Sequence, residues 1–400
     1  METGSTPHQY TWFRRLWHIL YDFTANIKDV TICPPKTLCR ATRIGYLVIS
    51  NNKGQLTLTL HTVTDGSKSA REWVQVLAKY RDPNTWRSVW ELGVTLTVYL
   101  GIWALALLAL QVHWTLSLLI AACNGPFIVR LFAIQHDCGH AAYFRNRRVN
   151  DWVGRALGVL TLTPYDVWRR QHSVHHAASG NLDRRGIGDV MTLTVTEYKS
   201  RTWRGRLAYR LYRHPVVMFG LGPAYLFLLT NRLPFGLMNA GAGYWVSSMG
   251  TNLSALAILT SLYLFGGWTA IFAIWLPTII VGATIGVWLF YVQHQFEEAN
   301  WYREEDWQIH DAALHGSSHY VLPRPLQWVT ANLGMHHVHH LYSRIPFYRL
   351  PEVLRDFPPL AAAQRMTIRD SLINVRLHLW DESQRRLLTW AQARAVHAQV

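Results

Sequence analysis

The chain has 400 residues, of which 50% are apolar, 16% are charged and 13% are aromatic, a mixture typical of membrane helices combined with large aqueous parts. A formal charge of +15 fits nucleic acid or an anionic membrane surface, but basic cytoplasmic loops of a membrane protein explain it more simply, so we expect no nucleic-acid partner. The four cysteines form no CxxC pair, which excludes a thiol zinc ribbon and an obvious iron–sulfur site.

Residues 1–68 differ from the rest of the chain, and we expect them to form an N-terminal extension of unknown role. Within them, "GYLVISNNKGQLTLTLHTV" alternates apolar and polar residues about an NKG turn, which predicts a small β-hairpin. The stretch "WFRRLWHILYDF" could lie on a membrane surface. Neither shows the charged start, apolar core and cleavage site of a signal peptide.

Two pairs of apolar runs follow, and each pair predicts a membrane hairpin. The runs are 92–110 with 114–134, and 253–267 with 271–292, the first arm of the second pair being short. Asn124 and Pro126 should kink the second run, and we expect Arg130 to reach the membrane interface. The alternative, buried helices of a large soluble core, is disfavoured by the length of these runs.

The segment 141–214 carries many more Lys and Arg than Asp and Glu, whereas the connectors within the hairpins carry no Lys or Arg. The positive-inside rule therefore places this segment and both termini on the cytoplasmic side. The apolar stretch 216–229 is short and contains Gly222 and Pro223, so we expect it to lie in the interface or dip into the membrane rather than cross it.

Histidine is unusually frequent, at 20 residues. His136 and His140 form an HxxxH pair directly after the second apolar run, a weak signal by itself. The stretch 163–181 predicts a helix, with Thr163 as N-cap, Pro164 at the first position and Gly180 at the C-terminal end. Its HxxHH pattern places three imidazoles, those of residues 172, 175 and 176, on one face.

A second HxxHH pattern lies between Pro325 and Pro346, where residues 326–346 predict another helix. His336, His339 and His340 repeat the same spacing, with Asn332 one turn before them. His337 lies at the edge of that face, and we do not count it as a ligand. Chance is a poor explanation of three such patterns, and eight imidazoles suit two metal ions better than one. Nitrogen donors of this kind favour iron, zinc, copper or nickel over magnesium or calcium.

These three boxes, "HDCGH", "HSVHH" and "HHVHH", separated by two membrane hairpins, resemble those of the membrane-bound fatty acid desaturases. The flanking "GNLDRRGIGDV", "MFGLGPAYLFLL", "VQHQFEEANW", "NLGMHHVHHLYSRIPFYRL" and "RLHLWDE" resemble bacterial members of the branch that includes the acyl-lipid omega-6 (delta-12) desaturases. The resemblance covers residues 69–400, the expected desaturase domain. It implies an all-α integral membrane protein of the bacterial inner membrane, with two transmembrane helical hairpins (about four spans) and a cytoplasmic helical cap that carries a His-rich di-metal site.

The resemblance also implies a set of site residues. The family has a ninth imidazole near the end of its fourth membrane helix, and His294 matches that place. The expected metal ligands are His136, His140, His172, His175, His176, His294, His336, His339 and His340, with no further catalytic residue. Asn332 is a candidate for a water-mediated metal contact, and Ala141 and Ala142 are candidates for the wall of a substrate tunnel. His310, His315 and His319 are expected outside the site. Six carboxylates lie near the boxes in sequence, and the sequence does not select among them: Asp137, Asp166, Asp183, Asp189, Glu297 and Glu298.

The implied reaction is O₂-dependent desaturation of the acyl chain of a membrane lipid or acyl thioester, with two iron ions as cofactor and O₂ as co-substrate. The chain shows no GxGxxG motif, cysteine cluster or HPGG haem-binding segment, so we expect a separate electron donor, by family a ferredoxin or a b-type cytochrome. The basic segment 141–214 could dock such a donor or bind anionic lipid. Two alternatives remain: a lipid hydroxylase, ketolase or epoxidase with the same site, and a metal transporter, which should place its ligands inside the spans.

Overall fold

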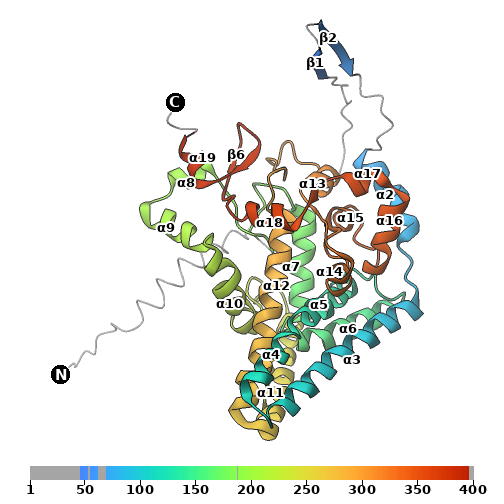
Figure 1. The fold of residues 1–400 in the computed structure, drawn as a ribbon, viewed down its shortest axis with the longest axis vertical. Coiled ribbons are helices and arrows are strands. Elements are labelled where there is room, and N and C mark those ends of the chain that lie inside the picture. Colours follow the sequence, from blue (N-terminus) through green and yellow to red (C-terminus); the bar gives the residue numbers. More distant parts are fainter. Residues whose placement is uncertain (1–45, 53–54, 62–68, 187, 396–400) are drawn as a thin grey trace, which may run out of the picture. The chain divides into compact units, whose positions relative to one another are not determined.

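The computed structural model describes residues 46–52, 55–61, 69–186 and 188–395. The chain divides into two units, Met1–Trp73 and Val74–Val400, each of which is described by itself. Helices make up most of the described chain (Figure 1).

The first unit contains the predicted hairpin. Strand β1 (Tyr46–Asn52) pairs antiparallel with β2 (Gln55–His61), and Asn52 faces Gln55 next to the turn. The turn residues 53–54 and the stretch "WFRRLWHILYDF" lie outside the described residues. Helix α2 (Ala70–Leu77) runs from this unit into the second one.

Three helical segments of the described chain are long and apolar enough to cross a bilayer, judged by length and composition. The first is α3 (Thr85–Ala109). The second, Trp114–Gly139, joins α4 (Trp114–Ala122) to α5 (Gly125–Gly139). The third, Ala242–His294, joins α11 (Ala242–Ala270), the π-helical turn η4 (Ile271–Trp275) and α12 (Leu276–His294). Helix α3 packs on α4 and α5, and α12 packs on both of these as well.

The third segment is broken near its middle. Gly266 (φ −150°, ψ 16°) and Gly267 (φ 61°, ψ −159°) leave the helical conformation, and the second of these angles favours glycine because it has no Cβ. A Cβ at Gly266 would lie 3.3 Å from the Leu110 side chain, so this break is next to the end of α3. The first arm begins at Ala242 rather than at Leu253, and the expectation of a short arm was wrong.

Arg130 does not reach the interface as expected. Its side chain is 1% exposed, and its Nε donates to the Thr95 hydroxyl at 3.0 Å. Its guanidinium forms an ion pair with Glu91 of α3 and donates to the Trp328 carbonyl. A buried arginine requires such partners because an unpaired charge inside the bundle would be costly to desolvate. No local sequence pattern pointed to Glu91, 39 residues away, as the source of the carboxylate.

The remaining helices and strands of the second unit are short. The helical elements are η1 (Ala78–Tyr80), α6 (Arg147–Leu160), α7 (Tyr165–Ala178), α8 (Val195–Ser200), α9 (Trp203–Tyr212), η2 (Val217–Leu221), α10 (Gly222–Leu228), η3 (Thr230–Arg232), α13 (Ile309–His315), α14 (Arg324–Val329), α15 (His336–Leu341), η5 (Phe347–Arg349), α16 (Leu350–Asp356), α17 (Pro358–Ala362), α18 (Ile368–Asn374) and α19 (Trp390–Ala395). The strands are β3 (Leu193–Thr194), β4 (His319–Tyr320), β5 (Arg365–Met366), β6 (Leu379–Asp381) and β7 (Arg386–Leu388).

The mostly helical fold was expected, and these five short strands are an addition to it. β6 lies between β3 and β7, parallel to the first and antiparallel to the second, and β4 pairs parallel with β5. Strands of two or three residues are too short to produce the alternation by which a sequence reveals a strand. The apolar stretch 216–229 forms η2 and α10, which pack against α12, and it is not among the three segments long enough to cross.

The helix predicted over 163–181 is present as α7, with Pro164 rather than Thr163 at its N-cap and Gly180 at φ 74° just after its end. The prediction of a single helix over 326–346 is wrong. The chain forms α14 and α15, separated by Ala331 and Asn332 in the left-handed conformation, at φ 49° and 55°.

Candidate metal centre

The nine predicted imidazoles lie at the ends of two apolar segments and on two short helices. They are His136 in the last turn of α5, His140 just after it, His172, His175 and His176 of α7, His294 at the end of α12, and His336, His339 and His340 of α15. α7 packs against α5, which brings the second box to the first.

The structure brings the nine imidazoles into two clusters. One cluster contains five residues and the other contains four, and within each cluster the ligand atoms lie within 4.8 Å of one another. The five are His136, His140, His172, His176 and His339, and the four are His175, His294, His336 and His340. The clusters adjoin, because the rings of His176 and His340 stack with centroids 4.2 Å apart.

Both HxxHH helices supply both clusters. In α7, His172 and His176 belong to the five-residue cluster and His175 belongs to the other. In α15, His336 and His340 belong to the four-residue cluster, and it is His339 that joins the five. In each helix the two histidines that are four residues apart belong to the same cluster. The third histidine of the pattern, which lies between them in sequence, belongs to the other cluster.

The spacing of the nitrogens fits metal ligation. Neighbouring Nε2 atoms within the clusters lie 2.9–3.1 Å apart, for example 3.0 Å between His140 and His172 and 2.9 Å between His336 and His340. Two nitrogens bound to one ion at about 2.1 Å lie about 3.0 Å apart at a right angle and about 3.4 Å apart at the tetrahedral angle. The observed distances fit ligands at right angles.

His175 provides a second observation in favour of a metal. Its Nδ1 lies 2.5 Å from the Asp189 carboxylate, whereas its buried Nε2 has no hydrogen-bond partner among the described residues. A buried nitrogen without a partner is costly. An ion in the four-residue cluster would satisfy it, while the contact with Asp189 fixes the orientation of the ring.

Two of the six candidate carboxylates contact one of the nine clustered histidines. One is Asp189; the other is Asp137, whose Oδ1 lies 3.2 Å from Nδ1 of His136 and whose Oδ2 accepts the backbone N–H of Phe347 at 2.7 Å. Asp137 therefore connects the first box to the segment after the third. Of the others, Asp166 pairs with Arg155 and Arg169, Asp183 pairs with Arg303, and Glu297 and Glu298 are exposed.

Burial keeps six of the imidazoles outside the three apolar segments uncharged. Removal from water lowers the pKa of these six well below 6.5, and the nearby imidazoles lower it further: His140, His172, His176, His336, His339 and His340. An uncharged imidazole offers a free nitrogen lone pair, so these groups are ready to bind a metal at neutral pH.

The histidines expected outside the site do lie outside the two clusters. Nε2 of His337 lies 2.8 Å from the Leu360 carbonyl, Nδ1 of His315 lies 3.1 Å from the Asp311 carbonyl, and Nδ1 of His319 lies 2.9 Å from the Ala361 carbonyl. His310 is also outside. Sequence reasoning missed Trp168, whose ring stacks on His172 at 4.6 Å. Its spacing of four from His172 on a predicted helix was the signal that could have identified it.

The remaining candidates lie in tightly constrained backbone. The Asn332 side chain donates to the Phe347 carbonyl at 3.1 Å. Ala141 has a left-handed φ of 52°, and Ala142 is 1% exposed with its N–H bonded to the Asp137 carbonyl at 2.9 Å. Both alanines directly follow the first box.

Comparison with known proteins agrees with this geometry. The family model for fatty acid desaturases matches residues 112–371. The chain is 41% identical over 320 residues to a fatty acid desaturase of Bacillus subtilis (strain 168), covering 80% of this chain and 90% of that protein. It is 26% identical over 293 residues to a sn-1 acyl-lipid omega-3 desaturase (ferredoxin) of Synechocystis, covering 70% and 77%. It is 27% identical over 258 residues to an endoplasmic-reticulum omega-3 fatty acid desaturase of Vigna radiata, covering 58% and 62%.

These matches, together with the three apolar segments and the histidine clusters, establish that the chain is a membrane oxidoreductase that belongs to the fatty acid desaturase family.

Proposed function

We propose that the protein introduces a double bond into the acyl chain of a membrane lipid or an acyl thioester, using two iron ions held by the nine imidazoles, O₂, and electrons from a separate donor protein. The observation that carries this proposal is the division of the nine imidazoles into two adjoining clusters in a member of the desaturase family. In the reaction, two neighbouring methylenes lose two hydrogens, and O₂ with two electrons and two protons from outside becomes two waters.

The ligand geometry supports iron. Nitrogens about 3 Å apart fit right angles between ligands, whereas structural zinc sites are almost always tetrahedral with four ligands. Iron bound there would supply the oxidising power that an unactivated methylene requires. The chain's own contribution is to hold imidazoles uncharged, to orient His136 and His175 through Asp137 and Asp189, and to bury or half-bury the nine rings away from bulk water.

The break at Gly266 and Gly267 supports a topology with four membrane crossings. If α11 up to the break and α12 are separate crossings, then α3, α4–α5 and these two arms make four, and the end of α5 meets the end of α12 on one side. The basic segment 141–214 supports placing that side in the cytoplasm of a bacterial inner membrane. Tags at residue 200 and at either terminus should then all be inaccessible to a label added outside intact cells. Labelling of residue 200 from outside would reject this topology.

The wall of the substrate tunnel is best tested at Ala142. Ala141 has a left-handed backbone, so a larger side chain there would add strain unrelated to the substrate. Ala142 is buried, and its backbone is not in the left-handed conformation, so a larger side chain there adds no such backbone strain. Ala142→Leu should therefore shift the double-bond position or the preferred chain length while the iron content stays unchanged. An unchanged product spectrum at full rate would place the wall elsewhere.

The deciding experiment is expression in a host with a defined acyl pool, followed by gas chromatography of the fatty acids. We expect products that have lost two hydrogens. Products that have gained oxygen would support a hydroxylase, ketolase or epoxidase instead. Purified protein that holds only zinc when grown with ample iron would contradict the oxidative chemistry altogether.

A further inference from the structure

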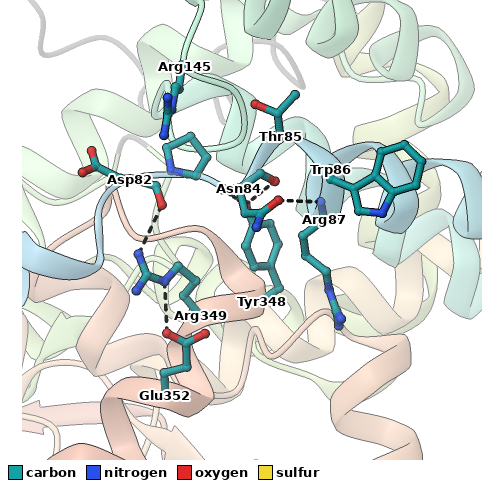
Figure 2. A pocket seen from close by; sticks show the side chains of 10 residues that line it. Asp82, Asn84, Thr85, Trp86, Arg87, Arg145, Tyr348, Arg349 and Glu352 are labelled. Atoms are coloured by element: carbon teal, nitrogen blue, oxygen red, sulfur yellow. Dashed lines mark hydrogen bonds and ion pairs between the residues drawn. The ribbon is translucent and has the colours of Figure 1, made fainter.

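A cavity lies apart from the metal centre, at the beginning of α3. It has a volume of about 770 Å³, and none of the nine clustered histidines lines it. Figure 2 shows Arg87, Arg145 and Arg349 among the residues that line it, with Tyr348 in the middle of the view and Trp86 at one side. Nothing in the proposed reaction requires three arginines here.

The cavity lies where a bilayer meets water. α3 is an apolar segment of 25 residues, and the cavity is at its first turn. Trp86 is 78% exposed and Trp90, one turn further, is 59% exposed. Exposed tryptophans at the end of an apolar helix mark the level of the lipid headgroups.

The cavity is also on the same side as the metal centre. The Ser88 hydroxyl donates to the Tyr143 carbonyl at 2.7 Å, and the Tyr143 hydroxyl donates to the Ser88 carbonyl at 2.7 Å. Tyr143 follows the first histidine box by three residues, so the start of α3 lies against that box. Tyr348, which lines the cavity, directly follows Phe347, whose N–H donates to Asp137 next to His136.

The positive charge of the cavity is only partly neutralised. Arg349 pairs with Glu352 at 3.1 Å. Arg87 pairs with Glu91 at 2.6 Å, but Glu91 also pairs with Arg130, so one carboxylate serves two guanidinium groups. Arg145 is exposed and makes no hydrogen bond or ion pair with any residue that the structure describes. The Asp82 carboxylate, which also lines the cavity, lies 3.8 Å from Arg81.

We propose that this cavity binds the phosphate of the glycerophospholipid whose acyl chain is the substrate. Guanidinium groups bind phosphate through two parallel hydrogen bonds, and Arg145 and Arg87 have donors available for it. A smaller cavity of about 360 Å³, lined by Asn84, Trp86, Arg87 and Trp90, adjoins the first and faces the outside of α3. It would receive the glycerol and the first carbons of a chain. This assignment rests on the proposed desaturase function, and it selects a lipid over an acyl thioester.

The test is a direct binding measurement on the full-length protein with its metal bound. Native mass spectrometry in detergent would compare phosphatidylglycerol with diacylglycerol, which has the same chains but no phosphate. Arg145→Glu should weaken the binding of phosphatidylglycerol about tenfold, because it removes a charge-assisted contact and adds a repulsion. Arg147→Glu is the matched control, since Arg147 is exposed nearby but does not line the cavity. Arg145→Gln should give a smaller loss of the same sign.

Three results would overturn the assignment. The first is equal binding of phosphatidylglycerol and diacylglycerol by the wild-type protein, and the second is equal loss in Arg145→Glu and Arg147→Glu. The third is displacement of phosphatidylglycerol by inorganic phosphate or by an acyl-coenzyme A at equal concentration, which would indicate a soluble phosphate ligand. Chromatography of the products separates this result from the proposed function: a wild-type protein that binds phosphatidylglycerol through Arg145 but makes no double bond would refute the function and leave the lipid site standing.

Discussion

The second and third histidine boxes have the same spacing but are built on different local structures. The second box lies on α7, a helix of 14 residues, whereas the third lies on α15, which has 6. In both, the residues four apart share one cluster and the other residue turns to its neighbour. An HxxHH pattern therefore needs only one helical turn to place three imidazoles, and the length of the surrounding helix can vary freely.

What holds the two helices in place differs accordingly. α7 packs along its length against α5, α6 and α11. α15 is too short to be stable by itself, and it depends on its packing against α13 and β4 and on backbone contacts at its two ends. The N–H of Tyr320 donates to the Gly334 carbonyl at 2.7 Å, just before α15, and the N–H of Phe347, after it, donates to Asp137 at 2.7 Å.

The largest expected effect comes from removing a ligand from either helix. His176→Ala should empty the five-residue cluster and His340→Ala the four-residue cluster, each reducing bound iron from about two to about one and activity by more than about 100-fold. His337→Ala is the matched control, because His337 is next to the third box but lies outside both clusters. Metal analysis and product chromatography on the same preparation would measure both quantities, and full activity in either ligand variant would remove that residue from the site.

Removing a carboxylate that orients a ligand should have the next largest effect. Asp189→Asn leaves the shape of the side chain intact but weakens its hold on His175, so activity and retained iron should fall by about 10-fold to 100-fold. Asp183→Asn is the control, since Asp183 is also near the second box but pairs with Arg303 at 2.6 Å. Equal effects of the two substitutions would mean that Asp189 acts only on the stability of the protein.

A methyl group added before α15 should reduce stability. A Cβ at Gly334 would lie closer to the Tyr320 carbonyl oxygen than real Cβ atoms do, and this oxygen belongs to the backbone and cannot move alone. Gly334→Ala should lower the free energy of unfolding by about 1–3 kcal/mol and release iron at lower temperature. Thermal unfolding in detergent with simultaneous metal analysis would test this, and an unchanged midpoint would contradict the dependence of α15 on this contact.

The corresponding change after α7 should have the smallest effect. Gly180 has φ 74°, and a Cβ there would meet Ala312 at 3.3 Å, so Gly180→Ala costs mainly the left-handed backbone, about 1 kcal/mol. Because α7 has its own extensive packing, iron should remain bound up to the unfolding temperature. Loss of iron below the unfolding temperature would show that the position of α7, like that of α15, depends on the contact at its end.

The same contrast explains what could be predicted from the sequence. Box spacing depends on helical geometry over one turn, so the nine histidines could be selected before their positions were known. The helix predicted over 326–346 failed because its interruption is imposed from a distance: Asn332 donates to Phe347 and Gly334 accepts from Tyr320. Asp137 and Asp189 could not be selected from the six carboxylates by sequence either, because the choice depends on which carboxylates lie next to a histidine in the folded chain. The Glu91 partner of Arg130 belongs to a different apolar segment, and no local pattern joins the two.

That buried Arg130–Glu91 pair has a consequence for biogenesis. An arginine at the centre of an isolated inserting helix costs about 2.5–3.5 kcal/mol, and α5 alone would bear a share of that cost for Arg130. Glu91, by contrast, follows the exposed Trp90 near the beginning of α3. Because Glu91 supplies the counter-charge of Arg130, we expect α5 to insert next to α3 rather than separately. Glu91 is synthesised before Arg130, so its carboxylate is already present at the membrane when Arg130 enters it.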